Sequence, residues 1–167
     1  MDDTADAAEL SKGGIYFHFR SKQEVFDSLV DEEFARSMEV LQKAREGAGT
    51  IAEKMMILGQ HYLEYFSSAP DAPRFFIVMG EMGLRDERLA ARLREMQAAF
   101  IDEIAKLVDL GVEEGVLRPM DSKAVATILK ALMDGIEGLH ALRFPLDIGL
   151  HLATGLDVLT NGIAKRD

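Results

Sequence analysis

Apolar residues recur along this chain at steps of three and four positions, the spacing that places side chains on one face of an α-helix. After Ser21 the recurring residues are Val25, Phe26, Leu29, Val30, Phe34, Met38 and Leu41. Ser21 and Glu24 have the spacing of a capping box, which marks a helix start. The pattern therefore predicts a helix of about 24 residues that ends near the Gly47-Ala48-Gly49 break.

The same periodicity predicts further helices along the rest of the chain. The expected helices run from Thr50 to the Ala69-Pro70 pair and over about 73–83, 86–115, 122–143 and 147–164. Thr50 and Glu53 form a second capping box, and Asp121 is the expected N-cap of the fifth helix. With four prolines and no two-residue alternation, the chain is predicted to be all-α.

The last two helices are apolar over more than one face. The residues in question are Ile128, Leu132, Leu139, Leu152, Leu156, Leu159 and Ile163. A helix pair at the end of a small domain covers one such face internally, so the surplus predicts a homodimer interface. The alternative, in which both faces are ordinary core, stays open.

The stretch SKGGIYFHFRSKQEVF, residues 11–26, leads into the first of these helices. Its first part, SKGGIYFHF, suggests a short helix that follows another, DTADAAEL at residues 3–10, after a tight turn. This is the pattern of a helix-turn-helix whose second helix enters the major groove. Ile15 and Phe19 would face the core of this domain. The outward positions are Lys12, Gly13, Tyr16 and His18, and Lys22 would lie at a helix start beside a phosphate.

This stretch closely resembles the signature of the TetR (tetracycline-repressor) family of bacterial transcriptional regulators. The resemblance rests on Ser11-Lys12-Gly13, Tyr16 to Phe19, and Ser21-Lys22 to Phe26. It implies that Lys12, Gly13, Tyr16, His18 and Lys22 contact operator DNA. It also implies a partial DNA-binding domain with its connecting helix at 1–46, and a helical ligand-binding and dimerisation domain at 47–167.

Two departures from the family pattern bear on DNA binding. Family members carry a further helix before this motif, and the turn here has Glu9 where the family usually has a glycine. We therefore expect the 167-residue chain by itself to bind DNA weakly or not at all.

Composition limits the remaining possibilities. The net charge is −10, and residues 1–46 hold six basic against eleven acidic side chains, which argues against a uniformly basic nucleic-acid binder. There is no cysteine, so disulfides and thiolate sites are excluded. No apolar run reaches the ~18 residues of a membrane span, and we expect a cytoplasmic protein.

The middle helices carry large, adaptable side chains of the kind that line a pocket for a hydrophobic small-molecule effector. The candidate ligand-binding residues are His61, Tyr62, Tyr65, Phe76, Met79, Met96, Phe100, Met133 and His140. A stripe of this kind is also typical of plain core packing, and only the family resemblance favours a pocket.

No catalytic constellation is present in the sequence. Glu137-x-x-His140 is a single step of a kind that binds metal in helical bundles, and a di-metal site needs two such steps with two further carboxylates. We therefore predict no enzyme, no cofactor and no metal. The predicted function is a ligand-responsive, homodimeric transcriptional regulator, which the resemblance implies to be a repressor. The alternative is a dimeric helical small-molecule-binding or interaction protein without DNA binding.

Overall fold

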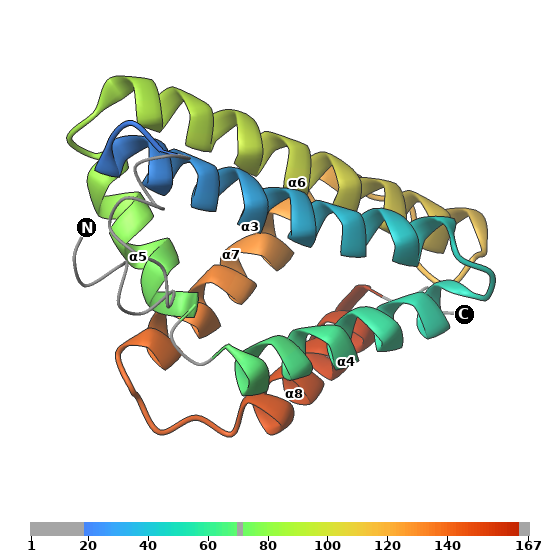
Figure 1. The fold of residues 1–167 in the computed structure, drawn as a ribbon. Coiled ribbons are helices and arrows are strands. Elements are labelled where there is room, and N and C mark those ends of the chain that lie inside the picture. Colours follow the sequence, from blue (N-terminus) through green and yellow to red (C-terminus); the bar gives the residue numbers. More distant parts are fainter. Residues whose placement is uncertain (1–18, 70–71, 164–167) are drawn as a thin grey trace. The chain divides into compact units, whose positions relative to one another are not determined.

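The computed structural model describes residues 19–69 and 72–163, and for residues 156, 159, 160, 162 and 163 it describes the backbone alone. Six helices form over these ranges (Figure 1). They are α3 (Lys22–Glu46), α4 (Ile51–Ser68), α5 (Ala72–Gly83), α6 (Glu87–Glu113), α7 (Ser122–Ala141) and α8 (Ile148–Ile163). The predicted all-α fold is confirmed, and the helix ends agree with the sequence pattern to within about two residues.

Contacts within the chain divide it into two units, residues 1–37 and 38–167. In the first unit the structure describes the start of α3. The Ser21 hydroxyl accepts a hydrogen bond from the Glu24 backbone N–H at 3.1 Å, as the predicted cap requires. The other half of the predicted box differs, because the Glu24 carboxylate accepts from the backbone N–H of Arg20 and not of Ser21.

The second unit is built around the pairing of α6 with α7. Its core contains Ile104 and Ala105 of α6 and Ala126 of α7, and Leu41, at the end of α3, packs against them. Ala126 has no exposed surface at all, and small side chains at such a contact let two helices approach closely. α5 also packs on both helices, and α8 lies beside α4 (Figure 1).

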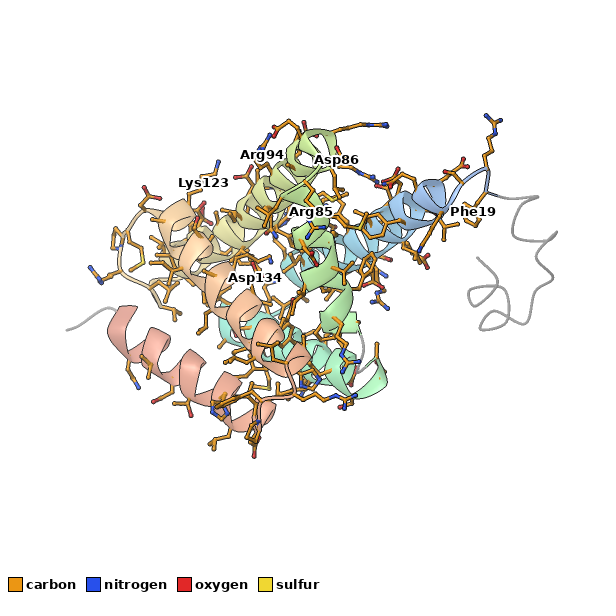
Figure 2. The ribbon with its side chains drawn as sticks, turned by 90° about the vertical axis from the view of Figure 1, so that its left-hand side faces the viewer. Phe19, Arg85, Asp86, Arg94, Lys123 and Asp134 are labelled. Carbon is orange, nitrogen blue, oxygen red and sulfur yellow. The ribbon has the colours of Figure 1, made fainter. Side chains whose placement is uncertain are left out.

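Caps fix the ends of these helices. Thr50 and Glu53 form the complete capping box that the sequence predicts at the start of α4. Asp86 caps α6, and Asp121 caps α7 by accepting from the Ala124 N–H. Figure 2 shows Asp86 at the start of α6. The sequence signals therefore locate these three helix starts correctly.

α6 ends in a glycine that adopts a left-handed conformation. Gly115 has a φ of +72°, its N–H donates to Val112 O at 3.0 Å, and the Val116 N–H donates to Gly111 O at 3.0 Å. These two bonds define a Schellman motif. Gly111 is also required for packing, because a Cβ there would lie 2.8 Å from a methyl carbon of Leu117.

α7 ends in the same motif without a glycine. Arg143 has a φ of +56°, its N–H donates to His140 O, and the Phe144 N–H donates to Leu139 O. The helix therefore stops at Ala141, two residues before the predicted end. Nothing at Arg143 signals this stop, because arginine rarely adopts a left-handed backbone.

Candidate functional site

The long side chain of Tyr62 connects α4 to α7 inside the second unit. Its hydroxyl lies 3.1 Å from the backbone oxygen of Met133 and 3.2 Å from Oε1 of Glu137. Donors of this kind, buried away from water, are stable only when an acceptor is provided. The two helices are therefore held together at this point by a polar contact within an apolar interior.

Aromatic rings pack beside Tyr62. Phe66 is only 4% exposed, and its ring meets those of Tyr62 and His140 edge-on at centroid distances of 4.8 and 4.9 Å. Tyr65 meets the same ring at 5.9 Å. Edge-to-face pairs at these distances place the positive edge of one ring on the negative face of another. Three rings from α4 and one from α7 thus form a continuous aromatic cluster.

An ion pair lies on the same side of α7, one turn before Glu137. Lys130 pairs with Asp134, and the Lys130 ammonium lies 5.5 Å from the centroid of the Phe100 ring on α6. Lys130 is 15% exposed in its side chain and Asp134 is 44% exposed, so the pair reaches from the interior to the surface. Figure 2 shows Lys123 near the start of α7 and Asp134 further along that helix.

The two partners at the centre have perturbed acid–base properties. The pKa of the Glu137 carboxyl is raised to about 7, chiefly because burial disfavours its charged form; Asp134 also raises this pKa, while Lys130 and the Tyr62 hydrogen bond lower it. The pKa of the Tyr62 hydroxyl is also raised, first by burial and then by the charge of Glu137. Near neutral pH, Glu137 therefore exchanges readily between its neutral and ionised forms.

The predicted ligand-binding residues divide into two groups. Tyr62, Tyr65, Met133 and His140 meet in this cluster, and Phe100 joins it through Lys130. The others lie apart from these contacts. His61 is exposed on α4, Phe76 and Met79 are partly buried on α5, and Met96 is partly buried on α6.

The predicted ligand-binding residues do not include the charged members, Lys130, Asp134 and Glu137; Glu137 stood out in the sequence only as part of a single metal-binding step with His140. A signal for them exists, because positions 126, 130, 133 and 137 follow steps of three and four and share one face of α7. Met133 on that face was a candidate, and its polar neighbours belong to the same site.

The opposite face of α7 carries the predicted dimer residues. Ile128, Leu132 and Leu139 are 61%, 42% and 41% exposed. On α8, Leu152 is partly buried, and a Cβ at Gly155 would lie 3.4 Å from Leu132. The side chains of Leu156, Leu159 and Ile163 are outside the described residues. α7 thus presents one face to the interior and an apolar face to solvent in the single chain.

Of the predicted DNA contacts, Lys12, Gly13, Tyr16 and His18 lie outside the described residues. Lys22 is exposed and is the first residue of α3. A basic side chain at a helix start, beside unpaired backbone N–H groups, suits a phosphate.

A second polar cluster ties the end of α3 to α4 and α6. Lys54 of α4 is 5% exposed, and its ammonium donates to the backbone oxygens of Arg45 at 3.0 Å and of Gly47. Glu103 of α6, also buried, accepts from Arg45 Nε at 2.9 Å. The orphan carbonyls at the end of α3 are thus satisfied by a buried cation from the next helix.

Glu114, at the end of α6, completes this junction by accepting from the backbone N–H of Ile51 at 3.0 Å. The first turn of α4 is thereby fixed to α6 by a carboxylate at its positive end. The end of α3 is therefore bonded to both α4 and α6, so a displacement of either helix is transmitted to it.

In the part of the chain that the structure describes, no helix is long and apolar enough to cross a membrane. Likewise, no three potential ligands among histidine, aspartate and glutamate converge there as they would around a metal ion.

Comparisons with known proteins agree with the fold and the motif. The family model of the C-terminal domain of BetI-type transcriptional repressors matches residues 60–164, and that of bacterial regulatory proteins of the tetR family matches residues 1–29. The chain is 24% identical over 148 residues to the uncharacterised HTH-type transcriptional regulator YfiR of Bacillus subtilis, a match that covers 86% of this chain and 70% of that protein.

Solved structures resemble the chain over almost its whole length. A putative transcriptional regulator from Saccharomonospora viridis in complex with choline has a TM-score of 0.82 at 19% identity, covering 98% of this chain and 86% of that one. A TetR transcription regulator from Haloarcula marismortui has a TM-score of 0.80 at 15% identity, covering 96% and 85%. At sequence identities this low, the similarity to these structures shows a shared fold and no more.

The class of protein is therefore a helix-turn-helix transcriptional regulator with a helical C-terminal domain. Because family models match both its N-terminal motif and most of its helical body, the chain belongs to the TetR family of bacterial transcriptional regulators. Members of this family act by binding DNA and are not enzymes.

Proposed function

We propose that this protein is a homodimeric repressor whose binding to operator DNA is weakened by a mostly apolar small molecule bound between α4, α6 and α7. The observation that carries the proposal is the polar cluster of Tyr62 and Glu137 in the apolar interior. It adjoins the aromatic rings of α4, two of which, Tyr62 and Tyr65, the sequence selects as ligand-binding residues. Pockets that bind small molecules combine an apolar lining with a few placed polar groups in this way.

The position of the cluster supports a route from effector to DNA. Tyr62 lies on α4, whose first turns hold the end of α3 through Lys54. An effector that separates Tyr62 from Glu137 displaces α4 relative to α7. Such coupling changes DNA affinity when the effector binds one arrangement more tightly than the other.

Homodimerisation is proposed from the exposed apolar stripe Ile128, Leu132 and Leu139 on α7. A contiguous apolar face of this kind on a soluble domain marks an interaction surface. Replacing Leu132 with glutamate would place a charge in that face. We expect the variant to elute as a monomer in size-exclusion chromatography with light scattering, while Gln97→Glu, exposed on α6, leaves the dimer intact. A dimer in both variants would move the interface elsewhere.

The effector site is tested by a thermal-shift screen of small molecules against the protein expressed from its complete reading frame. A hit is then titrated against Phe100→Ala and against the matched control Phe144→Ala, which removes a 55% exposed ring outside the cluster. We expect Phe100→Ala to weaken binding at least tenfold and the control to leave it unchanged. Equal binding by both variants would place the effector outside α4, α6 and α7.

The S. viridis protein with the same fold was solved with choline bound. This supports the view that bodies of this architecture bind small molecules.

A further inference from the structure

We propose that Glu137 carries a proton in the folded protein and donates it in a hydrogen bond to Tyr62, and that loss of this proton releases a latch between α4 and α7. The latch consists of Tyr62, Glu137 and the backbone oxygen of Met133. Its effect on DNA binding rests on the proposed function, because it uses the same route from α4 to α3. The protonation of Glu137 is independent of that function.

A count of hydrogen atoms is the first argument. The Tyr62 hydroxyl oxygen lies 3.1 Å from the backbone oxygen of Met133 and 3.2 Å from Oε1 of Glu137. A phenol has one hydrogen to donate, and a backbone carbonyl only accepts. If Glu137 is ionised it also only accepts, so the single hydrogen of Tyr62 serves one contact and leaves the other without any. If Glu137 is protonated it donates to Tyr62, which donates to Met133, and both contacts are hydrogen bonds.

The charges nearby favour the same assignment. The pKa of the Glu137 carboxyl is raised to about 7, first by burial, and the like charge of Asp134 also raises it while Lys130 lowers it. Lys130 is bonded to Asp134, which limits what it offers to Glu137. A Tyr62 hydroxyl that donates to the carboxylate lowers this pKa too, but the oxygen of Met133 competes for that hydrogen. The proton therefore leaves in the range around neutral pH.

Tyr62 itself keeps its hydrogen throughout this range. Burial raises the pKa of its hydroxyl above the ordinary value, and the charge of Glu137 raises it further. The group that changes its protonation is thus the carboxyl, and the phenol only changes the direction in which it donates.

Other titratable groups surround the latch and enter the design of the test. Those that act on it or adjoin its rings are Tyr65 on α4, and Lys130, Asp134 and His140 on α7. On α6, the buried Glu103 is bonded to Arg45 and Lys106. Exposed on neighbouring helices are His61 and Glu64 of α4, Arg74 and Glu81 of α5, and His151 and Asp157 of α8. Because histidines also change charge near neutral pH, the response of Glu137 is measured as a difference from a variant without this carboxyl.

The latch lies on a bonded route to the DNA-binding end of the chain. Ionisation of Glu137 removes one of the two hydrogen bonds by which Tyr62 holds α4 to α7. The first turns of α4 hold the end of α3 through Lys54, which donates to the backbone oxygens of Arg45 and Gly47. α3 is one continuous helix from residue 22 to residue 46. An effector that separates Tyr62 from Glu137 opens the same contact, so loss of the proton should also weaken DNA binding.

The first experiment detects the proton directly, without DNA or effector. Infrared difference spectra between pH 6 and pH 8 are recorded on the protein expressed from its complete reading frame. Carboxyl groups with ordinary pKa values are already ionised at pH 6, so the carbonyl band of a protonated carboxyl isolates Glu137. We expect this band at pH 6 in the wild type and in Glu95→Gln, an exposed site on α6, and its loss at pH 8. Glu137→Gln should lack it, and Tyr62→Phe should move it to higher frequency, because the acid loses its acceptor.

The second experiment follows the affinity for an operator fragment by fluorescence anisotropy at pH 6, 7 and 8, at one fixed salt concentration. The ionised fraction of Glu137 rises from about 10% at pH 6 to about 90% at pH 8. We therefore expect the affinity of the wild type to fall roughly threefold to tenfold more than that of Glu137→Gln. Glu95→Gln should follow the wild type. Circular dichroism at each pH confirms that every variant is folded.

The contrary results separate the two parts of the inference from each other and from the proposed function. The absence of the band in the wild type, its persistence in Glu137→Gln, or an unchanged band in Tyr62→Phe would overturn the latch and leave the proposed effector site standing. The expected band together with equal pH dependence of DNA binding in the wild type and Glu137→Gln would overturn its regulatory role. Titration of effector against Phe100→Ala judges the effector site separately.

Discussion

Replacing Glu137 with glutamine should make the protein without effector more stable at pH 8 than the wild type. The pKa of this carboxyl is about 7 in the folded chain, against an ordinary value of 4.5. Between these two values the folded state holds a proton that the unfolded state has released. Stability is therefore greatest below pH 4.5 and falls as the pH rises towards 7, after which it is constant.

The size of the effect follows from the displacement of the pKa. Each unit corresponds to about 1.4 kcal/mol, so ionising Glu137 in the folded protein costs about 3 kcal/mol of unfolding free energy. Glutamine has nearly the same shape, accepts from Tyr62 and does not ionise. The variant should thus match the wild type near pH 4.5 and gain up to about 3 kcal/mol on it at pH 8.

Urea denaturation followed by circular dichroism, at one fixed protein concentration and at pH 4.5, 6 and 8, measures this difference. The exposed Glu95→Gln variant serves as the control and should follow the wild type at each pH. Equal free energies of unfolding for Glu137→Gln and wild type across the whole range would refute the argument. That result would mean that Glu137 is solvated and that the polar centre of the site is misplaced.

Three smaller changes test the ends of the helices, each by the same denaturation assay. Lys54→Met keeps the buried apolar stem but removes the ammonium group from the carbonyls of α3, and we expect the free energy of unfolding to fall by about 2 kcal/mol. An unchanged free energy would mean that water satisfies these carbonyls equally well. Arg143→Gly removes the strain of a left-handed backbone at a non-glycine residue and should raise the free energy of unfolding by about 1 kcal/mol. A lower free energy of unfolding would show that the contacts of the arginine side chain stabilise more than the backbone strain costs. Gly115→Ala should lower the free energy of unfolding by about 1 kcal/mol, because alanine is strained at the positive φ of this position. Gly80→Ala should raise it, because this glycine lies inside α5 with open space at its Cβ. A change of the same sign in both variants would contradict the backbone argument.

The positions of the helices could be predicted because local sequence determines where each helix starts. Thr50 with Glu53, Asp86 and Asp121 each hydrogen-bond a backbone N–H no more than three residues away, so their role needs no knowledge of the tertiary structure. The end of α7 was not predictable in this way. Arg143 adopts its left-handed backbone because the surrounding turn demands it, and the residue type gives no sign of that.

The apolar part of the candidate site could be predicted from the sequence, and its charged part could not. Large apolar and aromatic residues such as Tyr62 and Phe100 stand out at helical spacing. Glu137 stands out only through its spacing from His140, and nothing in the sequence marks it as buried, because an acidic residue in a helix usually indicates a solvated face. Its partner inside the fold is Tyr62, 75 residues away, and a contact over such a distance cannot be read from one sequence. The same holds for the buried charges of Lys54 and Glu103.

The measurement that tests the central claim most directly is the coupling between effector and DNA. The protein expressed from its complete reading frame is first used to select its operator from genomic DNA, and the affinity for that fragment is then followed by fluorescence anisotropy as effector is added. We expect the effector to weaken DNA binding at least tenfold, which is the coupling between the two sites. Phe100→Ala should need at least tenfold more effector for the same release, because it binds the effector more weakly. DNA binding that does not change with effector, or identical release from Phe100→Ala and wild type, would contradict a regulatory site between α4, α6 and α7.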